Sequence, residues 1–348
     1  MRVFLVFCSM LFFAFPALGA VSISTSPQVD QIRPDLDLVD TQVRVTPNSE
    51  YEIIVRTPES HPLISTDFPI VEGTQLYHLR GFTKDGIIRF KTIYPIRGTY
   101  KISVLTGGTW EYLELDINET PGEIINLLIF SGFLLLLGLL GGYLLQKTAK
   151  AEGEAQKLNL TASVILLALL AGSFSGEVQA HSAAHDIEQK GFLQWSASEG
   201  DHTFSVQFDS NQAIVGESVT FHMQLVSEQK IIQEPFTVKM ETFHMEDKTV
   251  MFEGSFTSSK ATEESCGLCS ISTVVQFFDG AETKLTFTTT LPNGKQLSVD
   301  GVIGVEGRSP PTAVKIKTLL LLAGLILTGV ALGFFFIPTK KRTAANAV

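Results

Sequence analysis

The chain has 348 residues and a formal net charge of −10, with 26 basic against 36 acidic side chains. This balance argues against a nucleic-acid-binding protein, because no basic stripe is present to replace the counterions on phosphate. Hydrophobic residues make up 45% of the chain, and they are concentrated in a few long blocks. That distribution is typical of a membrane protein with soluble parts.

Residues 1–20 have the three-part layout of a secretory signal peptide. Arg2 supplies the positive charge, residues 3–15 form the apolar region, and residues 17–20 (Ala-Leu-Gly-Ala) form a cleavage site of small residues. We expect this segment to direct the following residues out of the cytoplasm.

Residues 124–145 form an almost unbroken apolar block. As a helix they would extend about 33 Å, enough to cross a hydrocarbon core of about 30 Å. The loop that follows, residues 146–159, carries three lysines and is expected to be cytoplasmic under the positive-inside rule. These lysines are Lys147, Lys150 and Lys157.

Residues 160–180 have two possible interpretations. They are either a second transmembrane helix or an internal signal peptide that is cleaved after Ala180, because a short apolar region follows lysine and ends in Val-Gln-Ala. A further apolar block, residues 318–337, precedes a basic tail at residues 338–348. We expect this block to be a transmembrane helix and the tail to be cytoplasmic.

The segment 21–120 reads as an all-β domain, because short alternating runs recur between turn residues. Strands are predicted at residues 42–45, 51–56, 75–80, 87–93, 99–105 and 110–117. The stretch Arg97-Gly-Thr-Tyr-Lys-Ile-Ser-Val104 resembles the penultimate strand of immunoglobulin-like domains. The resemblance implies that the Tyr100 hydroxyl is bonded to nearby backbone, although Ile102 stands where antibody domains have cysteine.

The segment 181–311 repeats this pattern. Strands are predicted at residues 192–197, 203–208, 218–226, 236–245, 249–256, 271–278, 284–290 and 296–305. Residues 213–221 (Ala-Ile-Val-Gly-Glu-Ser-Val-Thr-Phe) resemble the opening of an early strand in bacterial immunoglobulin-like sandwiches. The expected fold is therefore all-β extracytoplasmic domains plus transmembrane helices: two immunoglobulin-like β-sandwiches in tandem, each with a membrane anchor.

Potential metal ligands are concentrated in this second segment, where Phe-His-Met occurs twice. Imidazole together with thioether or thiolate suits copper, since soft sulfur favours Cu(I). The candidate ligands are His181, His185, His222, His244, Met251, Cys266 and Cys269.

Strand alternation assigns roles to some of these residues. Met223 is expected in the core and His222 on the outer face of the same strand. A simple hairpin at residues 246–248 would set His244 opposite Met251, with Cβ atoms about 5 Å apart. We expect His244 to be exposed and to share one Cu(I) site with Met251.

Cys266 and Cys269 form a Cys-x-x-Cys pair with three interpretations. A local disulfide, a sulfur metal site and thioredoxin-like redox chemistry are all open. The residues that follow are strand-like, which disfavours the redox reading because that chemistry needs a helix after the pair.

Cleavage after Ala180 would make His181 a new N-terminus, whose α-amine and imidazole could chelate copper. With His185 and the two Phe-His-Met triplets, this arrangement resembles periplasmic copper-binding β-sandwiches of the CopC and YtkA types. The resemblance implies copper binding by residues 181–307.

No catalytic motif is present: the sequence lacks G-x-S-x-G, HExxH and a phosphate-binding glycine loop. We therefore expect a non-enzymatic protein of the cell membrane, with both β-domains extracytoplasmic. The leading hypothesis is an accessory subunit that binds another membrane or extracytoplasmic protein. The alternatives are copper binding or delivery by the second segment, and thiol redox at Cys266 and Cys269.

Overall fold

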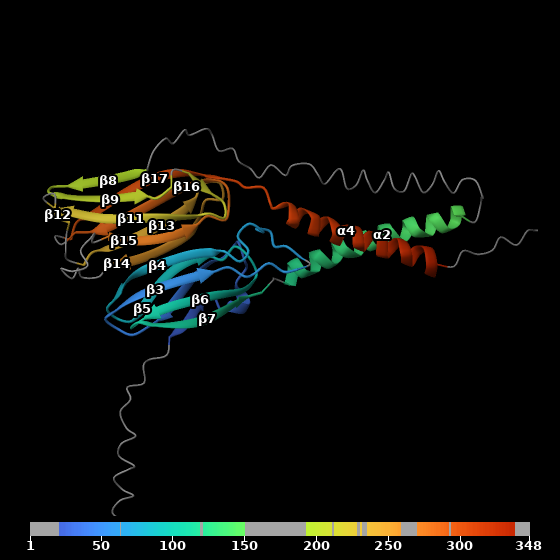
Figure 1. Cartoon of the computed structure of the whole chain (residues 1–348), viewed down its shortest axis with the longest axis horizontal. Helices are drawn as coiled ribbons and strands as arrows, with labels where there is room; N and C mark the ends of the chain where they lie inside the picture. The colour runs from blue at the N-terminus through green and yellow to red at the C-terminus, as the bar shows by residue number, and fades with distance from the viewer. Residues whose placement is uncertain are drawn as a thin grey trace, which may run out of the picture. The chain divides into compact units, whose positions relative to one another are not determined.

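The computed structural model describes residues 21–149 and 193–337, except residues 63, 119–120, 211, 228–229, 232–234, 259–269 and 292–293. The chain forms two compact units (Figure 1). The β unit comprises the described residues of 21–59, 70–118 and 193–308. The helical unit comprises those of 60–69, 121–149 and 309–337. The predicted signal peptide at residues 1–20, the apolar segment 160–180 and the tail 338–348 lie outside the described residues.

The β unit contains every strand that the sequence pattern predicts, and three short strands that it does not. The N-terminal half contains β1 (Ser22–Ser26), η1 (Val29–Gln31), β2 (Leu38–Arg44), β3 (Ser49–Arg56), β4 (Gln75–Thr83), β5 (Ile87–Ile93), β6 (Gly98–Thr106) and β7 (Thr109–Ile117). The C-terminal half contains β8 (Gln194–Glu199), β9 (His202–Phe208), β10 (Ala213–Ile214), β11 (Ser218–Ser227), β12 (Lys230–Ile231), β13 (Thr237–His244), β14 (Thr249–Thr257), β15 (Ser270–Gln276), β16 (Glu282–Thr290) and β17 (Gln296–Glu306). Alternating buried and exposed side chains explain why these segments form strands.

The two halves share both of their sheets, which differs from the two separate sandwiches expected from the sequence (Figure 1). One sheet has the order β1-β2-β5-β14-β13-β16-β17-β10, and the other has the order β7-β6-β3-β4-β15-β11-β9-β8. The halves meet where β5 pairs with β14 and β4 pairs with β15, both antiparallel. An open strand edge is a template for further pairing, so joining the halves covers four edges. The strands of segments 21–120 and 181–311 therefore belong to one β unit.

Aromatic packing continues across this junction. Phe252 of β14 lies 4.8 Å from Tyr77 of β4 and 6.4 Å from Phe90 of β5, measured between ring centroids. The two halves thus bury Phe252 together. Gly254 permits this packing, since a Cβ at that position would lie only 2.9 Å from the rings of Phe252 and Phe256.

Ion pairs cross the same junction on the outer face of the sheet. Glu253 of β14 is 3.3 Å from Lys91 of β5 and 3.0 Å from Lys239 of β13. The hydrogen bond from Lys239 is the main cause that lowers the pKa of Glu253 below its usual value near 4.5. Charged pairs thus fix the register of β5 against β14 from outside, while the aromatic rings do so from inside.

Tyr100 confirms the backbone tie expected from the immunoglobulin-like stretch. Its hydroxyl donates to Ile96 O at 2.7 Å and accepts from Ile96 N at 3.0 Å. The ring is buried and packs edge-on against Tyr94 at 4.8 Å. A buried hydroxyl with both partners satisfied is a local feature of many sandwiches, and here it supports the sandwich-like fold.

The helical unit contains two long apolar helices, α2 (Pro121–Ala149) and α4 (Thr312–Phe336). Their segments Ile124–Lys147 and Thr312–Phe336 are long and apolar enough to cross a membrane, as the sequence predicts for residues 124–145 and 318–337. Helix α4 begins earlier than expected and includes Lys317, whose Nζ donates to His61 O at 2.6 Å.

Glycines bring the two helices into backbone contact. A Cβ on Gly138 of α2 would overlap Ile326 O, and one on Gly142 would overlap Val330 O. On α4, Gly329 and Gly333 face backbone of α2 in the same way. Contacts advance along both helices in the same direction, so the helices are parallel. Small residues four apart are the usual means of such close approach in membranes.

Candidate metal centre

The structure describes three of the seven ligands proposed from sequence. His181, His185, Cys266 and Cys269 lie outside the described residues. His222 lies in β11 with an exposed side chain, as predicted. The other two, His244 and Met251, are both buried.

The expected pairing of His244 with Met251 is wrong. His244 lies opposite Thr249, because the register between β13 and β14 shifts between Thr242 and Phe243. Met251 falls at this irregularity and has no cross-strand partner in β13. A bulge of one residue redirects the following side chains, so the proposed imidazole–thioether pair is not formed. Met223 is buried, as expected for a core residue, and Met240 is buried as well.

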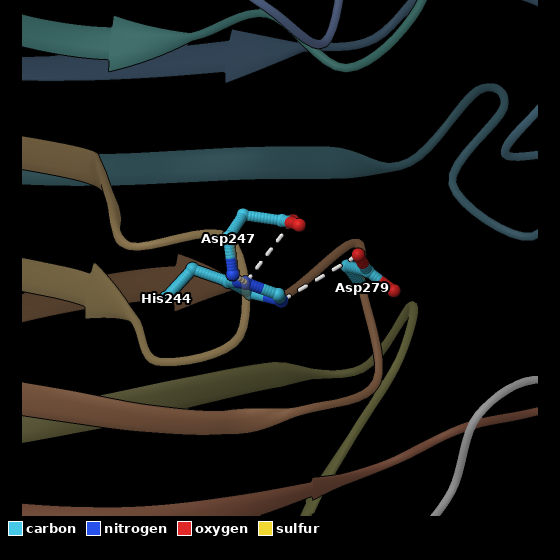
Figure 2. A group of neighbouring side chains, drawn as sticks. All are labelled: His244, Asp247 and Asp279. Atoms are coloured by element: carbon cyan, nitrogen blue, oxygen red, sulfur yellow. Dashed lines mark hydrogen bonds and ion pairs between the residues drawn. The ribbon is translucent and has the colours of Figure 1, made fainter.

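His244 instead lies between two aspartates at one end of the sandwich (Figure 2). It is the last residue of β13. Asp247 belongs to the turn between β13 and β14, and Asp279 belongs to the connection between β15 and β16. One ligand atom from each of the three side chains lies within 4.8 Å of the other two. Two segments distant in sequence, the β13–β14 hairpin and the β15–β16 connection, thus meet at one imidazole.

The two ring nitrogens of His244 have different partners. Nδ1 accepts a hydrogen bond from Asp247 N at 3.1 Å and also lies 3.2 Å from Asp247 Oδ2. Nε2 is buried, lies 3.5 Å from Asp279 Oδ2 and makes no hydrogen bond. A separation of 3.5 Å is long for a hydrogen bond between nitrogen and oxygen. Nε2 therefore lacks a well-formed partner although its surroundings are polar.

Thr283 adds a second polar atom without a partner beside this ring. It lies directly opposite His244 in the antiparallel pair of β13 and β16, so the two side chains share the inner face. The Thr283 hydroxyl is buried and makes no hydrogen bond. Buried polar groups are normally paired, so two such atoms at neighbouring positions mark an unusual place in the core.

Sequence reasoning identified His244 but neither aspartate. Asp247 could have been found from the sequence, because it lies three residues after His244 in a tight turn. Asp279 could not, because only the pairing of β13 with β16 brings the connection at residue 279 to His244. The arrangement offers imidazole and carboxylate ligands in place of the expected sulfur.

A second feature is an exposed aromatic surface on the outer face of the N-terminal half. Trp110 and Tyr112 alternate along the edge strand β7, and Tyr112 is 76% exposed. In the strand register, Leu105 of β6 lies opposite Trp110, while Ser103 of β6 lies between Tyr112 and Ile54 of β3. We call Ile54, Leu105, Trp110 and Tyr112 the aromatic face.

No protein-family model matches the chain, and no curated protein matches it significantly. Among solved structures, murine CRIg has 15% identity and a TM-score of 0.20, with 30% of this chain and 98% of that chain covered. Trypsin-activated α2-macroglobulin from Escherichia coli has 6% identity and a TM-score of 0.24, with coverages of 84% and 16%. The Yersinia pseudotuberculosis adhesin InvE has 7% identity and a TM-score of 0.18, with coverages of 81% and 58%. None of these three is described as a copper protein, and no function follows from scores this low.

Proposed function

We propose that this chain is a non-enzymatic accessory protein of the cell membrane, whose extracytoplasmic β unit binds another membrane or extracytoplasmic protein. The aromatic face carries the proposal. Trp110 and Tyr112 are of the residue types that dominate binding energy at protein interfaces. Large apolar side chains rarely gather on a free surface without a partner.

The rim of the aromatic face fits this role. Glu52 lies opposite Leu105 in the register of β3 and β6. Its carboxylate accepts a hydrogen bond from Arg80 at 3.1 Å and lies 2.7 Å from His78 Nε2. An apolar centre with a polar rim is the usual anatomy of a protein interface. The partner is therefore expected to present a complementary apolar surface with charged groups at its border.

The anchoring proposed here follows from how the helices join the β unit. Three residues separate Ile117 of β7 from the start of α2, and five separate Glu306 of β17 from the start of α4. Links of about 14 and 22 Å cannot cross a core of about 30 Å. Both helices therefore begin on the side of the membrane that holds the β unit, in agreement with their parallel packing.

This topology requires one more crossing. Ala149 ends α2 on the proposed far side, while Gln194 begins β8 in the β unit, which favours the membrane crossing expected from the sequence at residues 160–180. A phosphatase reporter fused after Arg308 should be active outside, and a cytoplasmic reporter fused after Val348 should be active inside. A silent cytoplasmic reporter at Val348, with a phosphatase active there, would contradict this topology.

The partner is tested by replacing Tyr112 with a photoreactive amino acid and irradiating intact cells. We expect a discrete cross-linked product that contains this chain and one other membrane or extracytoplasmic protein. The matched control is the same amino acid at Val302, which is 40% exposed in the other half, and which should give no such product. A product of two copies of this chain, or none, would contradict the proposal.

A second candidate function is binding of a transition metal by the C-terminal half. The sequence predicts that this metal is copper. The buried Nε2 of His244, which makes no hydrogen bond, favours this metal-binding function. The sulfur ligands that would select Cu(I) are not part of this cluster, since its members are imidazole and carboxylate groups.

A further inference from the structure

We propose that His244 Nε2 and Asp279 bind one divalent transition-metal ion of the zinc type, while Asp247 holds the imidazole ring from its Nδ1 side. The proposal does not depend on the aromatic face or its partner. It rests on the separation of the donor atoms, on the buried nitrogen without a hydrogen bond, and on the chemistry of the three side chains.

The separation between His244 Nε2 and Asp279 Oδ2 fits two ligands of one ion better than a direct bond. Zinc binds imidazole nitrogen and carboxylate oxygen at about 2.0–2.2 Å. Two ligands of a tetrahedral ion at those bond lengths stand about 3.3–3.6 Å apart. The observed separation is 3.5 Å.

Asp247 lies on the Nδ1 side of the His244 ring. In this structure Nδ1 accepts the Asp247 N–H at 3.1 Å, so an ion on Nε2 requires the ring proton to move to Nδ1. That hydrogen bond is then lost and the Nδ1 proton needs an acceptor. Asp247 Oδ2 lies 3.2 Å from Nδ1. A metal-bound histidine usually donates this second N–H to a carboxylate, which fixes the tautomer and the ring orientation. Asp247 therefore holds the ring in the orientation that presents Nε2 to the ion beside Asp279.

Charge and access also suit a divalent ion. The two carboxylates balance its charge, while 46% of the Asp279 side chain and 69% of the Asp247 side chain are exposed. The ion can therefore enter from solvent and complete its coordination with water. The nitrogen–oxygen ligand set selects a borderline divalent ion such as zinc(II) over Cu(I), which prefers sulfur.

The site lies where β17 leaves the β unit. Val305 N donates to Ala281 O at 3.1 Å, and a Cβ on Gly280 would lie 2.8 Å from the Gly307 Cα. Asp279 is thus next to the backbone that leads to α4. Binding of the ion would order the connection at residue 279 against this last segment of the unit.

The test is a zinc(II) titration of the full chain in detergent, by competition with a chromophoric chelator. We expect Asp279→Asn to lower the zinc affinity of this site at least tenfold, because it removes the carboxylate that faces His244 Nε2. The matched control Asp300→Asn changes an aspartate that is 52% exposed on β17 and should bind like the unmodified chain. Thermal melting of both variants checks that they are folded.

A second measurement reports geometry. Cobalt(II) in place of zinc should give an intense visible absorption in the unmodified chain and in Asp300→Asn, and a markedly weaker one in Asp279→Asn and Asp247→Asn. Both Asp variants change exposed side chains, so they keep the test valid even if a variant of buried His244 fails to fold. Equal zinc affinity and equal cobalt spectra in Asp279→Asn and the unmodified chain would overturn the proposal.

Discussion

Replacing Phe252 with alanine is expected to lower the free energy of unfolding of the whole β unit by about 3–5 kcal/mol. The ring is fully buried and packs against Tyr77 and Phe90 of the other half. Its removal would leave a cavity between the β5–β14 pair of one sheet and the β4–β15 pair of the other. If the sheets form one cooperative unit, the loss is shared by both halves.

The two tryptophans of the chain allow each half to be followed separately. Trp110 lies in β7 and Trp195 lies in β8. The Trp195 ring packs against Gly301, and its centroid lies 4.7 Å from the centroid of the Phe208 ring. In variants with a single tryptophan, denaturant unfolding should show both transitions shifting together on Phe252→Ala.

The control for this experiment is Val302→Ala, on an exposed position, which should change the free energy of unfolding by less than about 0.5 kcal/mol. A shift confined to the Trp195 signal would mean that the halves unfold separately. The sheet pairing at the junction would then contribute little to stability.

Replacing Gly329 with leucine is expected to separate α2 from α4. Even a Cβ at this position would overlap Leu135 O, and it would also lie 2.9 Å from Leu139 N and 3.0 Å from Gly138 Cα. Backbone atoms cannot move aside as a flexible side chain does. The helices must therefore move apart by about 1 Å for the added Cβ alone, because nonbonded carbon atoms need about 3.5–4.0 Å, and further for the rest of the leucine side chain.

Spin labels at Leu128 and Leu320 can report this change, since both side chains are exposed. Pulsed electron spin resonance should give a longer and broader distance in Gly329→Leu, with the three native cysteines replaced by serine. Gly324→Leu makes the same change in the same helix where no atom lies within 4 Å of the added Cβ. It should leave the distance unchanged, and an equal shift in both variants would refute the glycine contact.

The sequence by itself determined those features that depend on neighbouring residues. Alternation of apolar and polar side chains located the strands, because successive residues of a strand face opposite sides. The length of two apolar blocks predicted α2 and α4, because a helix needs about 20 such residues to cross a membrane. The Tyr100 tie was predictable because its partner is Ile96, only four residues away.

The aromatic face was only partly predictable from the sequence. Along β7 the alternation assigns Leu113 and Leu115 to the core face and Trp110 and Tyr112 to the outer face. It does not say that Leu105 of β6 and Ile54 of β3 lie on the same surface, because that depends on the pairing of three strands. The glycine contacts are similar: spacings of four are visible in the sequence, but nothing local says that Gly138 and Gly142 meet α4.

Tertiary structure alone decided the shared sheets and the His244 cluster. Strands β5 and β14 have open edges that could pair with many partners, and Phe252 with Glu253 selects one register. At His244, the register shift at Thr242 and Phe243 moved Met251 out of reach, and the pairing with β16 brought Asp279 near. These contacts join residues far apart in the chain, so their free energy depends on packing that no local pattern records.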